Sequence, residues 1–369
     1  MNRFTSIALI LAAVLSGPAR AADNGESYDY LLVLPFQHNY YQPIEAEGLG
    51  QGNGLDFVHG AAALFGNPAG IAGQGRYQLI MSASTLSAGR SSLSVSTDGS
   101  PALPSAAAVR LKWQVNDLDF ALGWRRAMDA NLCFPDMLNS EIIDWAGLSL
   151  EQYAAGWSLS AIKNFTLGIS VSLTRFDFKW DGPAGPLADG RGTAPGFSAG
   201  MSADLGQDFF FSAGFRSKTE MSCYTTFYGD SIRDQLKLAG AIPPTSWLSI
   251  AYTPEPGFEA HAGMELTGWH LVSSGYLEQM DYHLGCRIEL IEGRLDALAG
   301  SYSLKHPLDS YLRRYDPHLQ DLYFLTGGLA CRFGPVKLVW SGATSQPLSG
   351  KGLNQNILSV SIEYSTHLG

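Results

Sequence analysis

Charged side chains are scarce in this chain of 369 residues, since Asp, Glu, Lys and Arg make up only 16% of it. Acidic residues outnumber basic ones by 34 to 24, which leaves a formal net charge of -10 at neutral pH. Proteins that bind nucleic acid need a basic surface, so no nucleic-acid partner is expected. Long hydrophobic runs are also absent after residue 21, and none approaches the roughly 20 apolar residues of a transmembrane helix.

The cysteines are few and do not form a metal-binding pattern. The chain has four of them, and the spacing of Cys133, Cys223, Cys286 and Cys331 matches no metal site. We therefore expect neither a metal nor a cofactor.

The first 21 residues have the pattern of a secretory signal peptide. Asn2 and Arg3 precede an apolar core from Ile7 to Leu15, and Ala19-Arg20-Ala21 is an A-x-A cleavage signature. Cleavage is expected after residue 21, so the mature chain leaves the cytoplasm. No linker or block of charge divides the rest, which favours one large unit.

From Tyr77 onward, apolar and polar residues alternate with a period of two. In residues 109–115, Val109 and Leu111 point one way while Arg110 and Lys112 point the other, and residues 281–290 repeat the pattern. Nearly every predicted strand carries this alternation, aromatic residues recur near strand ends, and glycine is abundant, with 41 residues. These features predict an all-β, antiparallel transmembrane β-barrel, in which one strand face meets lipid and the other meets the lumen.

The pattern predicts about fourteen strands joined by alternating short and long connections. The short turns, such as Asn116-Asp117, Lys163-Asn164 and Gly334-Pro335, suit hairpins. Short periplasmic turns, long external loops and periplasmic termini are typical of bacterial outer-membrane barrels. The predicted strands are 77–86, 105–115, 118–127, 150–162, 165–178, 195–205, 208–218, 233–254, 257–272, 281–291, 294–304, 322–333, 336–344 and 355–364.

Residues 22–76 precede the predicted barrel, which occupies 77–369, and contain a compact apolar segment from Val58 to Gly73. Leu64 and Phe65 follow three alanines that favour a helical turn, and Asn67 is placed to cap a turn that begins at Pro68. This segment is too short to form a domain, so it must pack inside something larger. The glycine-rich GLGQGNG sequence at 48–54 lacks the lysine and the strand–loop–helix setting of a phosphate-binding loop.

Several sequence motifs, taken in order, carry a resemblance to a known family. GNPAGIA at 66–72 resembles the NPA hatch motif of the long-chain fatty-acid and hydrophobic-compound transporters of the outer membrane, the FadL/TodX type. Gly48-Leu49-Gly50 is similar to the N-terminal GLG of that family, and Phe215-Arg216-Ser217 stands in for its Y-R-S element. The stretch 236–269, with a proline-interrupted strand, adds to the likeness.

The resemblance implies a fourteen-stranded barrel whose lumen is closed by an N-terminal hatch formed by residues 22–76. It implies passive uptake of long-chain fatty acids or other hydrophobic compounds, and it gives a hatch or gate role to Asn67, Pro68 and Ala69, with Leu64 and Phe65 packed against the wall. Family members are thought to release ligand sideways at a kink in the third strand, here 118–127, where Gly123 is the weakest point.

Three cationic residues, Arg110, Lys112 and Arg125, face the lumen on adjacent predicted strands. Arginine and lysine both suit a carboxylate, so these residues are candidates for the head group of an amphiphilic ligand. The alternative is that they pair with Asp119, Glu259 and Glu265 to line the interior, and the two roles are compatible.

Catalysis has little support in the sequence. His261 and His283 are inward candidates on neighbouring strands, with Asp281 or Glu259 to orient them, but no nucleophile motif accompanies them. We interpret the two histidines as lumen lining and the protein as no enzyme.

Two alternatives to a hydrophobic-compound channel stay open. One is a related barrel that acts as a shuttle or scaffold for a secretion apparatus, and the other is a general porin. In each case a monomer in contact with outer-membrane lipid is expected, and for the channel a hydrophobic small molecule is the ligand.

Strand parity makes a prediction for the cysteines. Cys286 shares a face with Leu284, and Cys331 shares one with Leu329, on strands separated by another strand. Their backbones are then about 9–10 Å apart, at about 4.8 Å per strand. A disulfide needs Cα atoms within about 7 Å, so both are expected to be free. Cys133 and Cys223 are predicted in external loops, where a bridge between them stays possible.

Overall fold

The computed structural model describes residues 45–55, 58–73, 75–88, 102–113, 117–135, 142–162, 164–182, 185–227, 235–272, 276–307, 321–345, 347–348 and 355–366. The predicted signal peptide, at residues 1–21, lies outside these residues. The helices are α3 (Ala46–Gly50), η2 (Gly60–Phe65), η3 (Pro68–Ile71) and η4 (Trp269–Leu271). No helix in the described part of the chain is long and apolar enough to span a membrane.

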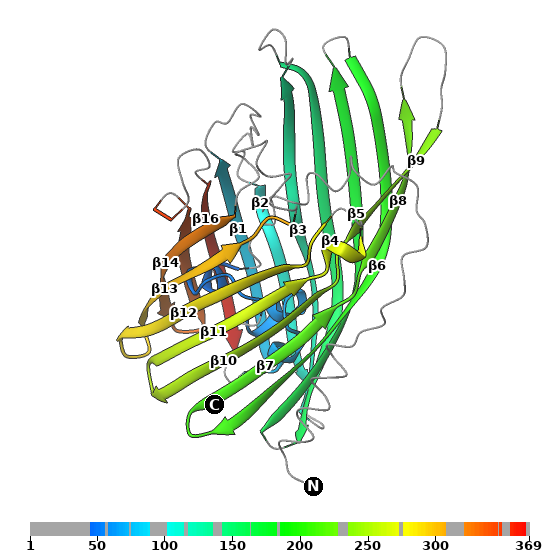
Figure 1. Ribbon diagram of the computed structural model, residues 1–369. Helices are drawn as coiled ribbons and strands as arrows, with labels where there is room; N and C mark the ends of the chain where they lie inside the picture. The colour runs from blue at the N-terminus through cyan, green and yellow to red at the C-terminus, as the bar shows by residue number, and fades with distance from the viewer. Residues whose placement is uncertain are drawn as a thin grey trace.

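Sixteen strands make up most of the described chain (Figure 1). They are β1 (Tyr77–Ala88), β2 (Ala102–Trp113), β3 (Leu118–Pro135), β4 (Ile142–Ile162), β5 (Phe165–Gly182), β6 (Gly185–Gly206), β7 (Phe209–Arg216), β8 (Thr219–Phe227), β9 (Gln235–Ile242), β10 (Thr245–Glu255), β11 (Phe258–Thr267), β12 (Gln279–Ile291), β13 (Leu295–Leu304), β14 (Leu322–Phe333), β15 (Val336–Thr344) and β16 (Gln355–Thr366).

Fourteen of these strands form a closed antiparallel barrel, as the sequence predicts. The ring closes because the first strand, β1, pairs with the last, β16, and Tyr77 lies opposite Thr366. Strand β7 pairs directly with β10, so β8 and β9 fall outside the ring. They form a hairpin that joins the wall through the pairing of β8 with β6.

The alternation that predicts the strands determines the two faces of the wall. On β5, Leu167, Ile169 and Val171 are 42–50% exposed on the outside, whereas Ser170 and Thr174 on the inside are 2% exposed. The outer face is therefore apolar and the inner face polar, which is the arrangement of a barrel in lipid.

The short connections are tight turns that contain left-handed residues. Asp117 (φ 48°), Asn164 (φ 66°) and Gly334 (φ 60°) each occupy one of the turns predicted from sequence. Asn, Asp and Gly tolerate positive φ better than other residues, which explains why these residue types mark the turns.

The strand predicted at 233–254 is wrong because the chain breaks there at Pro243-Pro244. Strand β9 before the break pairs with β8, and β10 after it pairs with β7. Proline has no N–H to donate, so two prolines in succession interrupt a ladder.

The predicted loops at 128–149, 179–194 and 219–232 are also corrected, because much of each is strand. Strand β3 continues to Pro135, β4 begins at Ile142, and only residues 183–184 separate β5 from β6. These extensions rise above the rest of the barrel on one side (Figure 1). Where both faces of a strand meet water, the backbone still pairs but the apolar–polar alternation fades, so the sequence does not mark the strand.

The cysteine predictions are partly right. Cys286 and Cys331 are free thiols, on strands separated by β13, as predicted. The placement of Cys133 and Cys223 in loops is wrong, because Cys133 lies in β3 opposite Trp145 and Cys223 lies in β8 opposite Leu238. A bridge between these two stays a prediction.

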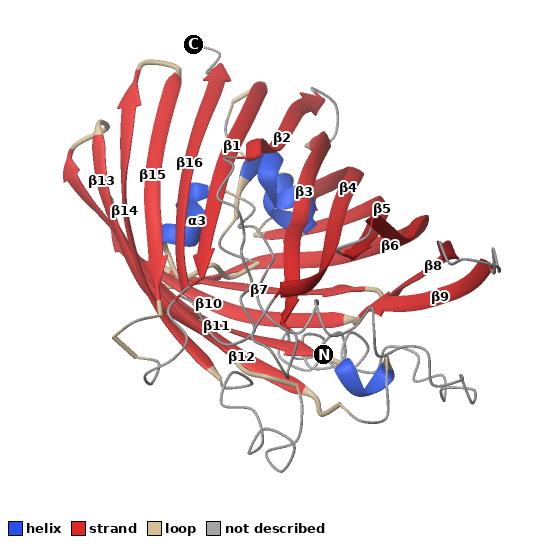
Figure 2. Ribbon diagram, turned by 90° about the horizontal axis from the view of Figure 1, so that it is seen from above, coloured by secondary structure: helices blue, strands red, loops and turns tan. Residues whose placement is uncertain are grey.

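The described residues 45–55 and 58–73 of the N-terminal segment lie inside the ring. Helices α3, η2 and η3 occupy the lumen between the opposing walls (Figure 2). We use "the hatch" for the described residues 45–55 and 58–73 of this segment. Its apolar residues, among them Ala61, Leu64 and Phe65, are buried together with Ile80, Ala108 and Ala121 of the wall.

Candidate functional site

The NPA sequence of the hatch rests on strands β5 and β6. The side chain of Asn67 accepts a hydrogen bond from Ala69 N (3.1 Å), which caps η3 as the sequence predicts. Its Nδ2 donates to Ser212 Oγ (2.5 Å) on β7. The backbone of Pro68 and Ala69 lies directly on Gly168, where even a Cβ would overlap it. The side chain of Asn67 lies equally close to Gly200. Each glycine thus forms a recess for the hatch.

Leu64 and Phe65 lie in two further recesses of the same wall. A Cβ added to Gly156 would stand 2.8 Å from Leu64 Cδ1, and one added to Gly123 would stand 3.0 Å from Phe65 Cζ. Sideways release at a kink near Gly123 stays a prediction. The ladders of β3 with β2 and β4 pass through Gly123 without a break, and the register shift falls between Arg126 and Met128.

Arg110 anchors the hatch and does not offer a free head-group site. Its Nη1 donates to Asp119 Oδ1 (2.8 Å) in a pair that is 98–99% buried, and its Nη1 and Nη2 donate to the carbonyls of Gly73 and Gly75. The alternative of pairing with Asp119 is thus correct for Arg110. A guanidinium committed to three acceptors has little capacity for a ligand.

The other two candidate cations differ from Arg110 and from each other. Arg125 donates to Gln152 Oε1 (2.8 Å) and stands over the ring of Phe65, 5.3 Å from its centroid. It also lines a cavity described below. Lys112 is half-buried opposite Asp119 in the β2–β3 ladder and does not line that cavity.

Helix α3 is anchored by charge on the opposite wall. The carboxylate of Glu47 pairs with Lys337 on β15 and lies 4.0 Å from Arg287 Nη1 on β12. Burial alone would raise the pKa of Glu47, but Lys337 and Arg287 hold it below its usual value. Burial raises the pKa of the neighbouring Glu45 well above its usual value, and the charge of Glu47 adds to that rise.

His261 and His283 hold successive carbonyl groups at the C-terminal end of α3. The Nε2 of His261 donates to Gln51 O (3.1 Å), and the Nδ1 of His283 donates to Gly52 O (2.8 Å). The other nitrogen of each ring faces a wall carboxylate at 3.7 Å, Glu259 or Glu265 respectively. Sequence reasoning places both side chains in the lumen but gives no hint of these hatch contacts.

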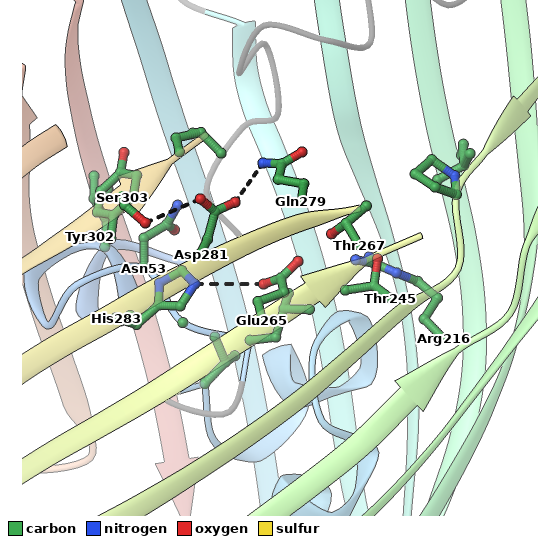
Figure 3. Close-up of a pocket in the computed structure, with 18 of the residues that line it drawn as sticks. Asn53, Arg216, Thr245, Glu265, Thr267, Gln279, Asp281, His283, Tyr302 and Ser303 are labelled. Carbon is green, nitrogen blue, oxygen red and sulfur yellow. Dashed lines mark hydrogen bonds and ion pairs between the residues drawn. The ribbon is translucent and has the colours of Figure 1, made fainter. Parts of the chain in front are cut away.

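A cavity with a volume of about 150 Å³ lies between the hatch and the inner face of the barrel, mainly strands β7 and β10 to β13. We call it the lumen cavity (Figure 3). Leu49 and Leu55 of the hatch give it apolar lining, as do Ile242 at the end of β9 and Ile357 on β16. Its polar side includes Asp281, whose carboxylate is occupied by three donors: Gln279 Nε2 (2.5 Å), Ser303 Oγ (3.1 Å) and Lys305 N (2.7 Å).

Arg216 also lines the lumen cavity, and the sequence does not predict a ligand-binding role for it. It ends β7, opposite Thr245, beside the break at Pro243 (Figure 3). Its Nε is buried and unpaired, and its guanidinium makes no hydrogen bond or ion pair with the residues that the structure describes. The Phe215-Arg216-Ser217 sequence carries part of the resemblance, but nothing in it distinguishes a lumen cation from a wall ion pair.

A closed fourteen-stranded barrel defines the structural class of this chain, and several solved structures are similar to it in fold. One is a FadL homologue of Pseudomonas aeruginosa, with a TM-score of 0.66 and 14% identity over 89% of this chain and 100% of that one. Another is the toluene transporter TbuX of Ralstonia pickettii, with a TM-score of 0.64 and 12% identity over 88% and 98%.

A third structure of the same class is the toluene transporter TodX of Pseudomonas putida, with a TM-score of 0.62 and 14% identity over 88% of this chain and 98% of that one. No protein-family model and no curated protein matches the sequence. The fold predicted from the resemblance is therefore confirmed through structure, at sequence identities that speak for the fold alone.

Proposed function

We propose that this protein is a monomeric outer-membrane channel that takes up long-chain fatty acids or similar hydrophobic compounds by passive diffusion, with the hatch as its gate. The observation that carries the proposal is the lumen cavity, which hatch and wall line together. It combines apolar walls for a hydrocarbon with a cation, Arg216, that has no protein partner among the described residues.

The size of the lumen cavity supports a gating role for the hatch. Pockets that hold drug-sized ligands have volumes of about 300–1,000 Å³, whereas this one has about 150 Å³. A long acyl chain does not fit unless the hatch moves away from the wall. The cavity then represents the closed state of the pathway.

Arg216 is the residue that we propose binds the carboxylate of the ligand. Arg125, which also lines the lumen cavity, is the second candidate. Arg110 is excluded because its guanidinium is occupied by Asp119 and by hatch carbonyls. A planar guanidinium binds a carboxylate through two parallel hydrogen bonds, which suits a head group held at the polar end of an apolar cavity.

The position of the hatch disfavours a general porin, since that alternative predicts a hatch in the periplasm and the described hatch residues lie in the lumen. The shuttle or scaffold alternative gains one observation, the wall of β3–β6 that rises above the barrel and offers an external surface (Figure 1). A pull-down of secretion components with intact cells tests that alternative.

The test of the channel is uptake into proteoliposomes of a radiolabelled long-chain fatty acid and of an uncharged aromatic hydrocarbon. Arg216→Gln is expected to lower fatty-acid uptake about tenfold to a hundredfold, since a charge-assisted hydrogen bond contributes about 1.5–3 kcal/mol. Hydrocarbon uptake should not change. Arg294→Gln, in an exposed turn at the other end of the barrel, is the control. Equal fatty-acid uptake in all three proteins would refute the role of Arg216, and no uptake by the wild type would refute the channel.

A further inference from the structure

One inward row of polar residues crosses the wall of the lumen cavity. In the strand ladders its members stand opposite one another in turn, so neighbouring side chains share a face, with Cβ atoms about 4.5–5.5 Å apart. Arg216 is its single charged member. We call this set the polar row, and it consists of Ser170, Ser198, Arg216, Thr245, Thr267 and Gln279, on β5, β6, β7, β10, β11 and β12 respectively.

The members at the two ends of the polar row have hydrogen-bond partners. Ser170 Oγ and Ser198 Oγ lie 3.1 Å apart. At the other end, Gln279 Oε1 accepts from Trp269 Nε1 (2.6 Å), and Gln279 Nε2 donates to Asp281 Oδ2 (2.5 Å). The protein itself therefore satisfies these side chains, and they need no ligand.

The three members in the middle of the polar row differ from those at its ends. Thr245 and Thr267 are 3% and 8% exposed, and their hydroxyl groups make no hydrogen bond with the residues that the structure describes. The same holds for the guanidinium of Arg216. All three line the lumen cavity, next to one another on adjacent strands (Figure 3). Burying polar groups without partners is unfavourable, so three such groups in succession indicate a binding site.

The site needs a ligand that accepts hydrogen bonds. In the next inward row the carboxylates already have partners, since Glu265 faces His283 at 3.7 Å and Asp281 accepts from three donors. A carboxylate that binds Arg216 in bidentate form engages both its oxygens there, which leaves the threonine hydroxyl groups without an acceptor. A hydroxyl group carries no charge, donates one hydrogen bond and accepts others, so it suits a neutral oxygen.

We propose that Thr245 and Thr267 form a neutral subsite beside Arg216, which binds the hydroxyl or carbonyl oxygen of an uncharged hydrophobic ligand. The substrate class of the channel is then hydrophobic compounds with a polar oxygen. Acids are held at Arg216, and alcohols or ketones at the two threonines. A plain hydrocarbon of the same shape gains neither interaction. This inference rests on the proposed channel function and deepens it.

The volume of the lumen cavity determines the size of the probe. That volume is about 150 Å³, and an apolar cavity of about 150 Å³ in another protein holds benzene. A one-ring compound is therefore small enough for the cavity while the hatch stays in place. Benzene, phenol and benzoate share one ring, so they compare no oxygen, a neutral oxygen and a carboxylate.

The test measures binding of radiolabelled benzene, phenol and benzoate to the purified full chain in detergent, by equilibrium dialysis with a detergent-only blank. The variant is Thr245→Val with Thr267→Val, because valine keeps the branched shape of threonine and lacks its hydroxyl group. Thr174→Val is the matched control. Thr174 also faces inward, is 2% exposed and has an unpaired hydroxyl group, but it does not line the lumen cavity.

The double variant is expected to bind phenol about tenfold more weakly than the wild type, with its affinity for benzene unchanged. Arg216→Gln should weaken benzoate binding and leave phenol binding unchanged, and the control should match the wild type for all three ligands. Heat-modifiable migration on gels shows whether each variant is folded. The two single variants, each expected to lose about threefold in phenol affinity, replace the double variant if it is not.

The proposal is wrong if the folded variants bind phenol as tightly as the wild type. It is also wrong if the affinities for phenol and benzene fall together, since that result would indicate a general disturbance of the cavity. Fatty-acid uptake into proteoliposomes is measured on the same proteins. No uptake by the wild type would refute the channel, whereas phenol binding tests the neutral subsite, so the two failures appear in different readouts.

Discussion

The two ends of the hatch are attached to the barrel by different kinds of contact. The η2–η3 end lies on the tall wall of β3–β6, where shape dominates, because Phe65, Leu64 and Pro68 fill recesses at wall glycines. Arg110 adds hydrogen bonds to Gly73 and Gly75 at this end. The α3 end lies against β11–β16, where charge and polar hydrogen bonds decide, through Glu47 with Lys337 and through two histidines.

This difference indicates which end of the hatch responds to conditions. Contacts between apolar groups and glycine backbone change little with pH or salt, whereas ion pairs weaken with both. The lumen cavity lies beside the α3 end, where Leu49 and Asn53 line it. We therefore expect α3 to release first, with η3 as the fixed point of the hatch.

Filling one of the glycine recesses gives the largest expected effect. In Gly168→Ala, the new Cβ overlaps the backbone of Pro68 and Ala69, which cannot rotate away as a side chain can. We expect the η3 contact to lose about 1–3 kcal/mol. Hydrogen–deuterium exchange of residues 64–72 should increase.

The matched control is Gly327→Ala on β14, where the nearest atom to the new Cβ is Leu298 O at 3.6 Å. Alanine in a strand is slightly favoured over glycine, so the control should be neutral or stabilising. If both variants protect residues 64–72 equally, the recess at Gly168 does not hold the hatch.

Acid should loosen the α3 end more than the η2–η3 end. The pKa of Glu47 is lowered from 4.5, so its stabilising contribution is present above that value and is lost as pH falls through the folded pKa. The charged groups around it are Lys337, Arg287 and Glu363, with Glu45 on the same helix. Exchange of residues 46–52 should rise in acid more than that of residues 64–72.

Glu47→Gln should weaken α3 at neutral pH by up to about 3 kcal/mol, because Lys337 keeps only its longer pair with Glu363 (3.9 Å). It should also remove most of the acid response. Glu220→Gln serves as the control, since the side chain of Glu220 is 75% exposed and its pair with Lys218 contributes little. An unchanged pH profile in Glu47→Gln would assign the acid response to another group.

Much of the barrel can be predicted from sequence because residues that face lipid are apolar and the alternate residues, which face the lumen, are polar. Leu167 and Ser170 illustrate this, and positive-φ turn residues such as Asn164 mark where strands end. The alternation of apolar and polar residues stops where a strand leaves the membrane. The sequence therefore predicts loops where the structure has the extensions of β3, β4 and β6.

The site is less readable, because a residue's parity gives its direction but not its partner. Arg110 and Arg216 both point inward, yet Arg110 is occupied by Asp119 and Arg216 is not. A glycine within a strand, such as Gly123, predicts a weak point in the ladder. Only the packing of Phe65 against it shows that Gly123 forms a recess. Contacts between segments this far apart in the chain leave no local pattern in the sequence.

The central claim is that the hatch must leave the wall for a ligand to pass, and a reversible lock tests it most directly. A Cβ at Gly50 would stand 3.4 Å from the Cβ of Ser341 on β15, close to the separation of about 3.5–4.5 Å in disulfides. Leu298, whose Cδ1 and Cβ would lie 2.8 and 3.0 Å from it, must shift to admit it, so Gly50→Cys alone is also assayed for uptake. Gly50→Cys with Ser341→Cys, in a background without the four native cysteines, therefore ties α3 to the wall. Oxidation is predicted to stop fatty-acid uptake into proteoliposomes, and reduction to restore it, while each single variant is insensitive to both. Equal uptake by the fully oxidised and reduced double variant would contradict the claim.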